Sequence, residues 1–228
     1  MTPIGVPLLG MDLFVIGDVH GCYHTFLELL QHWQPKKERL IQLGDLTDRG
    51  NFAPECVALA MELSEKHPEQ AVFLKGNHEA GMLDYYSPDD IPTSWPEWGG
   101  SLTIDQYDAQ PDLLEAHLTW IKQRPLFWEN DHVFASHAGI SDTLDPFDEE
   151  SSDSVLWYRG RSATSANCSS LATRPSSTTH QQSIKNLTRL TSIRVPCMAT
   201  CSLAPAFRRL VNSARLFRCL PIGRIVCG

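Results

Sequence analysis

Five polar side chains of the 228-residue chain have the types and spacing of a site for divalent metal ions. They are Asp18, His20, Asp45, Asn77 and His137. Carboxylate oxygens, imidazole nitrogens and amide oxygens are acceptable ligands for borderline or hard divalent ions. Asp45 lies in the middle of the series and is the best candidate for a bridging ligand, because a shared carboxylate can hold two ions about 3.5–4 Å apart. Such a pair of ions can acidify a water molecule and neutralise phosphoryl oxygens.

Each of these residues follows a predicted strand. Short apolar runs at 12–16, 39–43 and 71–75 predict buried strands, and apolar residues at helical spacing predict helices over 22–33 and after Pro54. The runs 126–128 and 132–136 predict a hairpin that ends at His137. Strands that alternate with helices predict a layered α/β fold, in which polar loops gather at the carboxyl ends of the strands. We therefore expect the five side chains to converge at one edge.

Residues 84–111 are rich in Pro, Asp, Trp and Gly and have no clear period. This composition predicts an irregular insertion, which we interpret as a wall of the substrate groove. Helical spacing returns at 112–122.

The composition predicts a cytosolic protein with one main domain over residues 1–160. The chain is 42% apolar and 20% charged, which is typical of a globular fold. No run approaches the roughly eighteen apolar residues that a membrane helix needs, and residues 1–10 lack the pattern of a signal peptide. The net charge of −8 argues against nucleic acid and anionic membranes as partners, because both bind clustered Lys and Arg.

The composition changes abruptly near residue 160. Residues 1–160 hold 27 acidic and 9 basic residues, a net charge of −18, whereas 161–228 hold 10 basic and no acidic residues. This basic tail is rich in Ser and Thr and contains five of the seven cysteines. Because it has no coherent amphipathic period, we expect much of it to be poorly ordered.

Four motifs of the acidic part resemble those of a known enzyme family. They are GDVHG (17–21), GDLTDRG (44–50), GNHE (76–79) and SHAG (136–139). In this order and spacing they resemble the metal-binding signature of the phosphoprotein phosphatase family of metallophosphoesterases, especially its small bacterial serine/threonine phosphatases. The resemblance covers 11–160 and implies a β-sandwich flanked by helices. It also implies two divalent metal ions, for which we expect manganese, with iron or zinc as alternatives.

The resemblance assigns a role to each motif residue. The first ion would be bound by Asp18, His20 and Asp45, and the second by Asp45, Asn77 and His137. His78 would be the general acid that protonates the leaving oxygen, with Asp48 as its partner. Arg49, Arg159 and Asn77 would hold the substrate phosphate, a task that suits the guanidinium fork. We interpret Glu79 as a residue that orients the ligands.

Three functions are compatible with these residues. The resemblance implies hydrolysis of phosphoserine or phosphothreonine in proteins, by a water molecule that the two ions convert to hydroxide. A symmetrical diadenosine tetraphosphate hydrolase is the alternative enzyme, because that class shares loops like GDVHGCY and GDL; DRG, GNHE and VLWYRG (155–160) favour the protein phosphatase. The third hypothesis is a catalytically defective chain that binds metal or phosphorylated partners.

The resemblance ends at the compositional break. The family carries a GHT motif after WxRG, whose histidine completes the second metal site, and then an IDTG strand that closes the sheet. Neither motif occurs in 161–228, so we expect the closing strands to be absent and the second ion to be bound weakly. Residues 167–175 can be encoded by codons that spell LQFIGHTP when the reading frame is moved by two bases. The same shift allows IDTGAVY from codons for 191–198. This favours a frameshift as the origin of the tail over the alternative of a genuine basic tail.

The frameshift hypothesis predicts an insertion or deletion near codon 160, because a single shift restores both missing motifs in the family's order. Sequencing the coding DNA around Arg159 checks this. An uninterrupted frame that matches related genes through 161–228 would contradict it.

Overall fold

The computed structural model describes residues 11–89, 92–130, 133–143 and 145–159, and the backbone of 171–173 and 217–218. The strands are β1 (Asp12–Ile16), β2 (Glu38–Gln42), β3 (Ala71–Phe73), β4 (Phe127–Glu129), β5 (Val133–Ser136), β6 (Leu171–Thr173) and β7 (Phe217–Arg218). The α-helices are α1 (Tyr23–Leu30), α2 (Ala53–Lys66), α3 (Asn77–Tyr85), α4 (Gly100–Asp108) and α5 (Pro111–Lys122), with a 3₁₀ helix η1 (Trp95–Trp98). The predicted strands and helices of the acidic part are therefore present, with ends that differ by a few residues.

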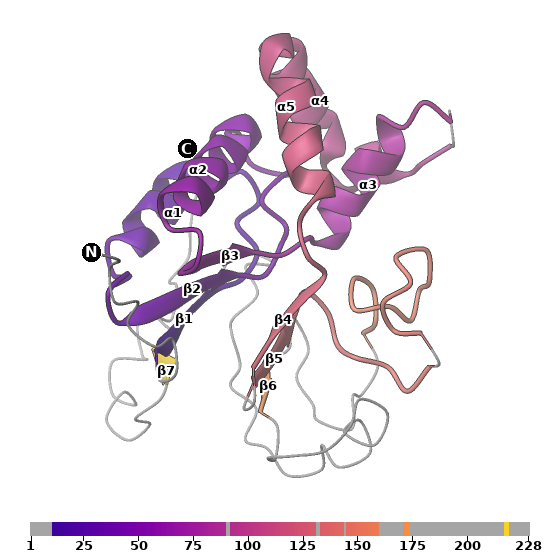
Figure 1. Ribbon diagram of the computed structural model, residues 1–228. Helices are drawn as coiled ribbons and strands as arrows, with labels where there is room; N and C mark the ends of the chain where they lie inside the picture. The colour runs from indigo at the N-terminus through magenta and orange to yellow at the C-terminus, as the bar shows by residue number, and fades with distance from the viewer. Residues whose placement is uncertain are drawn as a thin grey trace, which may run out of the picture.

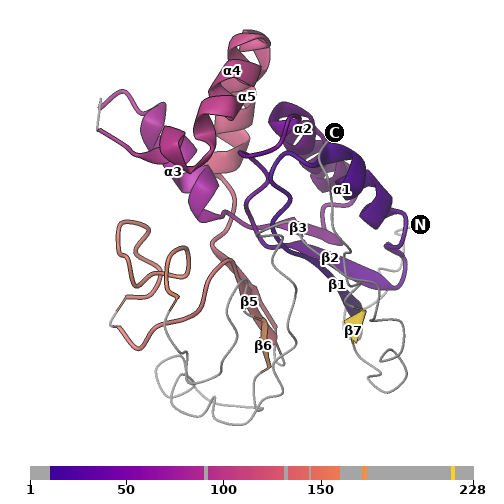
Figure 2. The same ribbon diagram turned by 180° about the vertical axis from the view of Figure 1, so that it is seen from behind.

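Two sheets form the framework of the molecule (Figure 1). The first sheet is parallel with strand order β3-β2-β1-β7, and the second is antiparallel with strand order β4-β5-β6. Figures 1 and 2 show α1 and α2 on one side of the first sheet and the second sheet on the other side. The predicted layered α/β fold, a sandwich flanked by helices, is confirmed.

The alternation of side chains along β1 explains the layers. Phe14 and Ile16 belong to the core beneath the helices, whereas Leu13 and Val15 belong to a second core that also contains Val133 of β5. Successive side chains of a strand point to opposite faces, so a strand that is apolar at every position can be buried on both. This is why 12–16 is a continuous apolar run.

The interpretation of 84–111 as irregular is wrong for its second half, which forms η1 and α4. The buried residues of α4 are Gly100, Thr103 and Tyr107. They have helical spacing, but a glycine, a threonine and a tyrosine do not form the apolar pattern by which an amphipathic helix is predicted from sequence. Gly100 is required by packing, since a Cβ there would lie 2.5 Å from the Trp95 ring.

The described backbone beyond residue 160 differs from the expected lack of closing strands. Residues 171–173 pair with β5, and residues 217–218 pair with β1. Edge strands present unpaired N–H and C=O groups to which an extended segment can add. The expectation of poor order in the tail otherwise falls on residues outside the described ranges.

None of the helices among the described residues is long and apolar enough to cross a membrane.

Candidate active site

The predicted ligands come together where strands end. Asp18 follows β1 by two residues, Asp45 follows β2 by three, and His137 follows β5 directly. Asn77 and His78 are the first two residues of α3, which begins shortly after β3. The five predicted ligands, His20 among them, and the predicted acid His78 are all buried.

Asp45 lies at the centre of this cluster. Its Oδ2 atom is 3.6 Å from Nε2 of His20, 3.6 Å from Nε2 of His137 and 4.0 Å from Nε2 of His78. Nε2 of His20 is also 3.8 Å from Oδ2 of Asp18. Two sets of possible ligand atoms, each within 4.8 Å, share Asp45, namely His20, Asp45 and His78, and Asp18, Asp45 and His137. The shared carboxylate is the arrangement expected of a bridging ligand.

Backbone carbonyls orient the histidine rings. Nδ1 of His20 donates to the carbonyl of Thr47, and Nδ1 of His137 donates to the carbonyl of Leu43, each at 2.9 Å. The lone pair is therefore on Nε2, which faces the cluster in both rings. Nε2 of His137 lies 2.7 Å from Oδ1 of Asn77. Two lone-pair atoms directed at the same space fit a bound cation. A nitrogen and an oxygen ligand together suit a borderline divalent ion.

Burial controls the charge of the site. Desolvation lowers the pKa of His20 to about 4, with the neighbouring His78 adding to the effect, and lowers the pKa of His137 to about 4. Desolvation raises the pKa of Asp45 well above its ordinary value, and the nearby carboxylates of Asp18 and Glu79 raise it further. At neutral pH the two imidazoles of the metal-free protein are therefore neutral, whereas burial shifts Asp45 toward its protonated form.

Glu79 joins the loop after β2 to the start of α3. Its Oε2 accepts the backbone N–H groups of Asp45 and Gly76 at 2.6 and 2.9 Å. Its Oε1 accepts those of Leu46 and Thr47 at 2.8 and 3.2 Å. Burial raises the pKa of Glu79, and these backbone donors oppose the rise. The predicted orienting role of Glu79 thus acts on the backbone of the Asp45 loop.

Four non-glycine residues of the site have left-handed backbones, with φ of 47° at His20, 59° at Asp45, 72° at Asp48 and 63° at Arg49. Such conformations cost free energy and persist where the surroundings hold them. Backbone N–H groups of Val19 and His20 both donate to the carbonyl of Asp45, at 2.9 and 2.8 Å. The loops after β1 and β2 therefore hold each other.

Close backbone approach explains the glycines of the motifs. A Cβ on Gly44 would lie 2.4 Å from the nitrogen of Gly76, and a Cβ on Gly50 would lie 2.2 Å from the carbonyl oxygen of His20. Any side chain there would push the three loops apart.

Asp48 and His78 form the predicted pair. Nδ1 of His78 is 2.5 Å from Oδ2 of Asp48, whose side chain is fully buried. Nε2 of His78 faces Arg49, whose Nη2 donates to it at 2.9 Å, while Nη1 donates to Nε2 of His20 at 2.8 Å. The guanidinium group therefore spans two histidines of the cluster.

Arg159 lies at the end of a segment that packs on the His137 loop. The backbone N–H of Ala138 donates to the carbonyl of Val155 at 2.6 Å, and that of Gly139 to the carbonyl of Tyr158 at 3.2 Å. The Arg159 charge contributes to lowering the pKa of His137. Its exposed guanidinium contacts the carbonyl of Leu156 at 3.5 Å. Its role toward a phosphate stays a prediction.

Two residues bonded to Asp48 were not anticipated as functional. The indole N–H of Trp95 donates to Oδ2 of Asp48, and the hydroxyl of Thr103 donates to Oδ1, each at 2.7 Å. A buried carboxylate in the DRG loop requires hydrogen-bond donors. These donors lie 47 and 55 residues further along the chain, and no sequence pattern links positions so far apart.

Comparison with known proteins agrees with this geometry. The family model for calcineurin-like phosphoesterases matches residues 11–166. The chain belongs to the calcineurin-like phosphoesterase family. The resemblance to metallophosphoesterases is thereby confirmed, and with it the membership of a family of hydrolases with a dinuclear metal site.

The relatives of this phosphoesterase include two kinds of enzyme. A PP2A-like serine/threonine-protein phosphatase PPG1 of Candida albicans is 28% identical over 143 residues, which are 62% of this chain and 32% of that protein. A symmetrical bis(5'-nucleosyl)-tetraphosphatase of Actinobacillus succinogenes is 33% identical over 140 residues, which are 59% of this chain and 46% of that protein. The chain thus spans less than half the length of these two relatives.

Among solved structures, a Saccharomyces cerevisiae protein serine/threonine phosphatase with similarity to human phosphatase PP5 aligns with a TM-score of 0.46 and 20% identity. The alignment covers 68% of this chain and 51% of that one.

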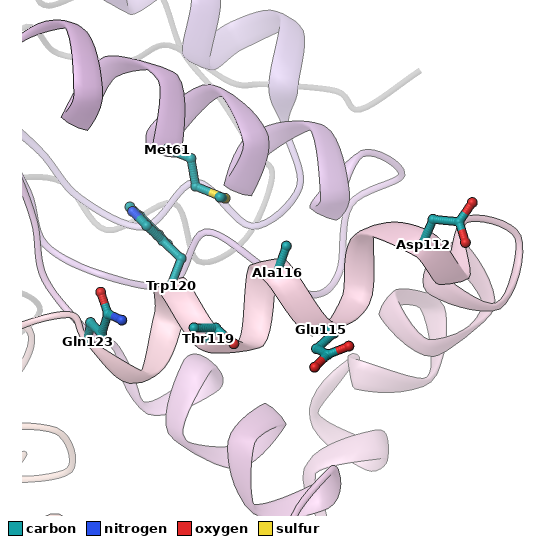
Figure 3. Close-up of a pocket in the computed structure, with 7 residues that line it drawn as sticks. All are labelled: Met61, Asp112, Glu115, Ala116, Thr119, Trp120 and Gln123. Carbon is teal, nitrogen blue, oxygen red and sulfur yellow. The ribbon is translucent and has the colours of Figure 1, made fainter.

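A surface pocket of about 500 Å³ lies elsewhere, between α2 and α5 (Figure 3). It is lined by Met61, Asp112, Glu115, Ala116, Thr119, Trp120 and Gln123. None of these belongs to the cluster around Asp45.

Replacing Glu79 by Gln is expected to lower both stability and metal affinity. An amide NH₂ at one of the two positions would face backbone N–H groups and leave them unpaired, at a cost of roughly 1–3 kcal/mol in the free energy of unfolding. Mn²⁺ affinity should fall about 10- to 100-fold, because the Asp45 loop loses its anchor. Urea unfolding and calorimetric Mn²⁺ titration measure the two effects. Glu62→Gln, on the exposed face of α2, is the control, and equal values for both variants would contradict the anchoring role.

Metal binding is expected to release protons, and more of them as the pH is lowered, because burial raises the pKa of Asp45 and a bound cation would displace its proton, whereas the neutral imidazoles have none to give. Mn²⁺ titrations in buffers of different ionisation enthalpy measure the number released. A binding enthalpy that is the same in all buffers would show that Asp45 is already ionised.

Proposed function

We propose that this chain is a metal-dependent phosphomonoesterase that acts on phosphoserine and phosphothreonine in proteins. The proposal includes two divalent ions, of which manganese is our choice, and a phosphoprotein or phosphopeptide as substrate. Membership of the calcineurin-like phosphoesterases supports the reaction class.

The observation that carries the proposal is the pair Asp48 and His78 beside Asp45. Nε2 of His78 is 4.0 Å from Oδ2 of Asp45, and its Nδ1 is 2.5 Å from Asp48. An imidazole oriented by a carboxylate, next to a carboxylate with the geometry of a bridging ligand, is suited to give a proton to an oxygen that leaves phosphorus. A serine or threonine alkoxide is a poor leaving group and needs that proton.

The residues of the chain would divide the work as follows. Asp18, His20, Asp45, Asn77 and His137 would hold the ions. Bound ions would lower the pKa of a water molecule and neutralise charge on the phosphoryl oxygens. Arg49 has a guanidinium within reach of both His20 and His78, and would bind the phosphate together with Asn77 and Arg159. His78 would hold the proton for the leaving oxygen on Nε2 when Arg49 binds the phosphate instead of this nitrogen, because Nε2 cannot carry a proton while it accepts the Arg49 N–H.

A nucleotide substrate is the second candidate, since the symmetrical tetraphosphatase of Actinobacillus succinogenes is 33% identical to this chain. In this alternative, diadenosine tetraphosphate takes the place of the phosphopeptide at the same residues.

Substrate assays with Mn²⁺ decide between the candidates. We expect release of phosphate from phosphoserine and phosphothreonine peptides, with His78→Asn slowing it about 10²- to 10⁴-fold through loss of the general acid. His117→Gln replaces a buried histidine of α5, whose Nδ1 contacts the Tyr107 hydroxyl, and should leave the rate within a few-fold. Turnover of diadenosine tetraphosphate with no action on phosphopeptides would overturn the proposal.

The hypothesis of a catalytically defective chain is tested in the same assay. A version of the chain that carries the restored frame, with GHT after residue 160, should bind the second ion more tightly and turn over faster, because a metal site gains a ligand. Equal activity of the two versions would show that the histidine of GHT is dispensable. Activity only in the restored version would favour the catalytically defective chain over the enzyme.

A further inference from the structure

The carboxylate of Asp48 is held by a separate donor on each oxygen. The indole N–H of Trp95 donates to Oδ2, and the hydroxyl of Thr103 donates to Oδ1, each at 2.7 Å. The backbone N–H of Asp48 in turn donates to the Thr103 hydroxyl oxygen at 3.0 Å. All three residues have an exposed fraction of 0%, so water does not substitute for any of these bonds.

This arrangement fixes the direction in which Asp48 faces His78. A carboxylate with one partner can rotate about its Cβ–Cγ bond, whereas donors on both oxygens fix its plane. Oδ2 is then directed at Nδ1 of His78, and the opposite ring atom, Nε2, is directed at the cluster around Asp45. The direction of the proposed acid is therefore set by η1 and α4.

We propose that Trp95 and Thr103 are positioning residues for the transfer of a proton by His78. The inference rests on the proposed function, because it assumes that His78 acts as the general acid. No hydrogen bond joins either side chain to Nε2 of His78 or to the ligand atoms of Asp45 among the described residues. They act through Asp48 alone, and their loss should leave the metal site in place.

Substrates with different leaving groups separate positioning from mere stability. Departure of 2,4-dinitrophenolate needs little help from an acid, whereas departure of phenolate needs a proton. We expect Thr103→Val and Trp95→Phe to slow phenyl phosphate hydrolysis by about 10-fold or more, and 2,4-dinitrophenyl phosphate hydrolysis by less than about 3-fold, since general acid catalysis contributes about 10²- to 10⁴-fold. KM and Mn²⁺ affinity should stay near their original values.

Two variants serve as controls. Tyr107→Phe removes a buried hydrogen bond from the same helix α4, between the phenol and His117, at 2.8 Å, and should slow both substrates equally or not at all. Thr103→Ser keeps the hydroxyl and should restore the original dependence on the leaving group. A Tyr107→Phe variant with the same selective loss would overturn the inference, as would a Thr103→Val variant with none.

A readout without turnover completes the test. The Nδ1 proton of His78, held against Asp48, should give a downfield proton resonance in the metal-free protein, identified by its absence from His78→Asn. We expect this resonance to shift or broaden in Thr103→Val and Trp95→Phe and to stay unchanged in Tyr107→Phe. An unchanged resonance in the first two variants would overturn the inference.

His78→Asn also separates this inference from the proposed function. If its rate loss is the same for good and poor leaving groups, the general acid role fails and the positioning role fails with it. If His78→Asn is selective for poor leaving groups and neither Trp95→Phe nor Thr103→Val is, the positioning role alone fails.

Discussion

The bonds from Glu79 to the backbone of the Asp45 loop are the constraint on which the rest of the site depends. Asp45 belongs to both sets of possible ligands. Its backbone is left-handed, with φ of 59°, a conformation that non-glycine residues do not favour and that the surrounding structure must hold. Four backbone N–H groups converge on the two oxygens of Glu79, which begins α3 together with Asn77 and His78. One buried carboxylate therefore sets where the bridge lies relative to the next ligand and the proposed acid. Its desolvation is offset by the same donors that it orders.

The electrostatics of the cluster favour a cation at its centre. Burial keeps His20 and His137 neutral, with pKa values of about 4, and their lone pairs point inward. On one side of Asp45 the Arg49 guanidinium donates to Nε2 of His20. An Nε2 lone pair that binds a metal ion cannot also accept this N–H, so the two cations exclude each other at that atom. A bound metal ion would therefore leave the Arg49 fork free to bind an anion, which is the role that the family resemblance predicts for it.

The sequence predicted those parts of the site that follow from local pattern. Apolar strands are followed by Gly17, Gly44 and Gly76, and in a layered fold the side chains at the ends of such strands lie close together. The ligand cluster could therefore be predicted from the sequence. The donors to Asp48 were not, because Trp95 and Thr103 reach it across 47 and 55 residues and α4 has no hydrophobic period. Metal-binding roles of the individual residues stay predictions, since geometry shows proximity and not occupancy.

The two sheets contribute unequally to the site, and this explains why the compositional break matters. The segments that follow strands of the parallel sheet carry Asp18, Asp45 and His78, whereas among the described residues the antiparallel sheet contributes His137 at the end of β5. The distance of 3.6 Å between His137 and Asp45 is set by the apolar core between the sheets, in which Leu13 and Val133 pack. The strand that covers β5 on its other edge, β6, comes from beyond the compositional break. A change in the residues after 160 would therefore act first on the support of His137, the predicted ligand that follows β5.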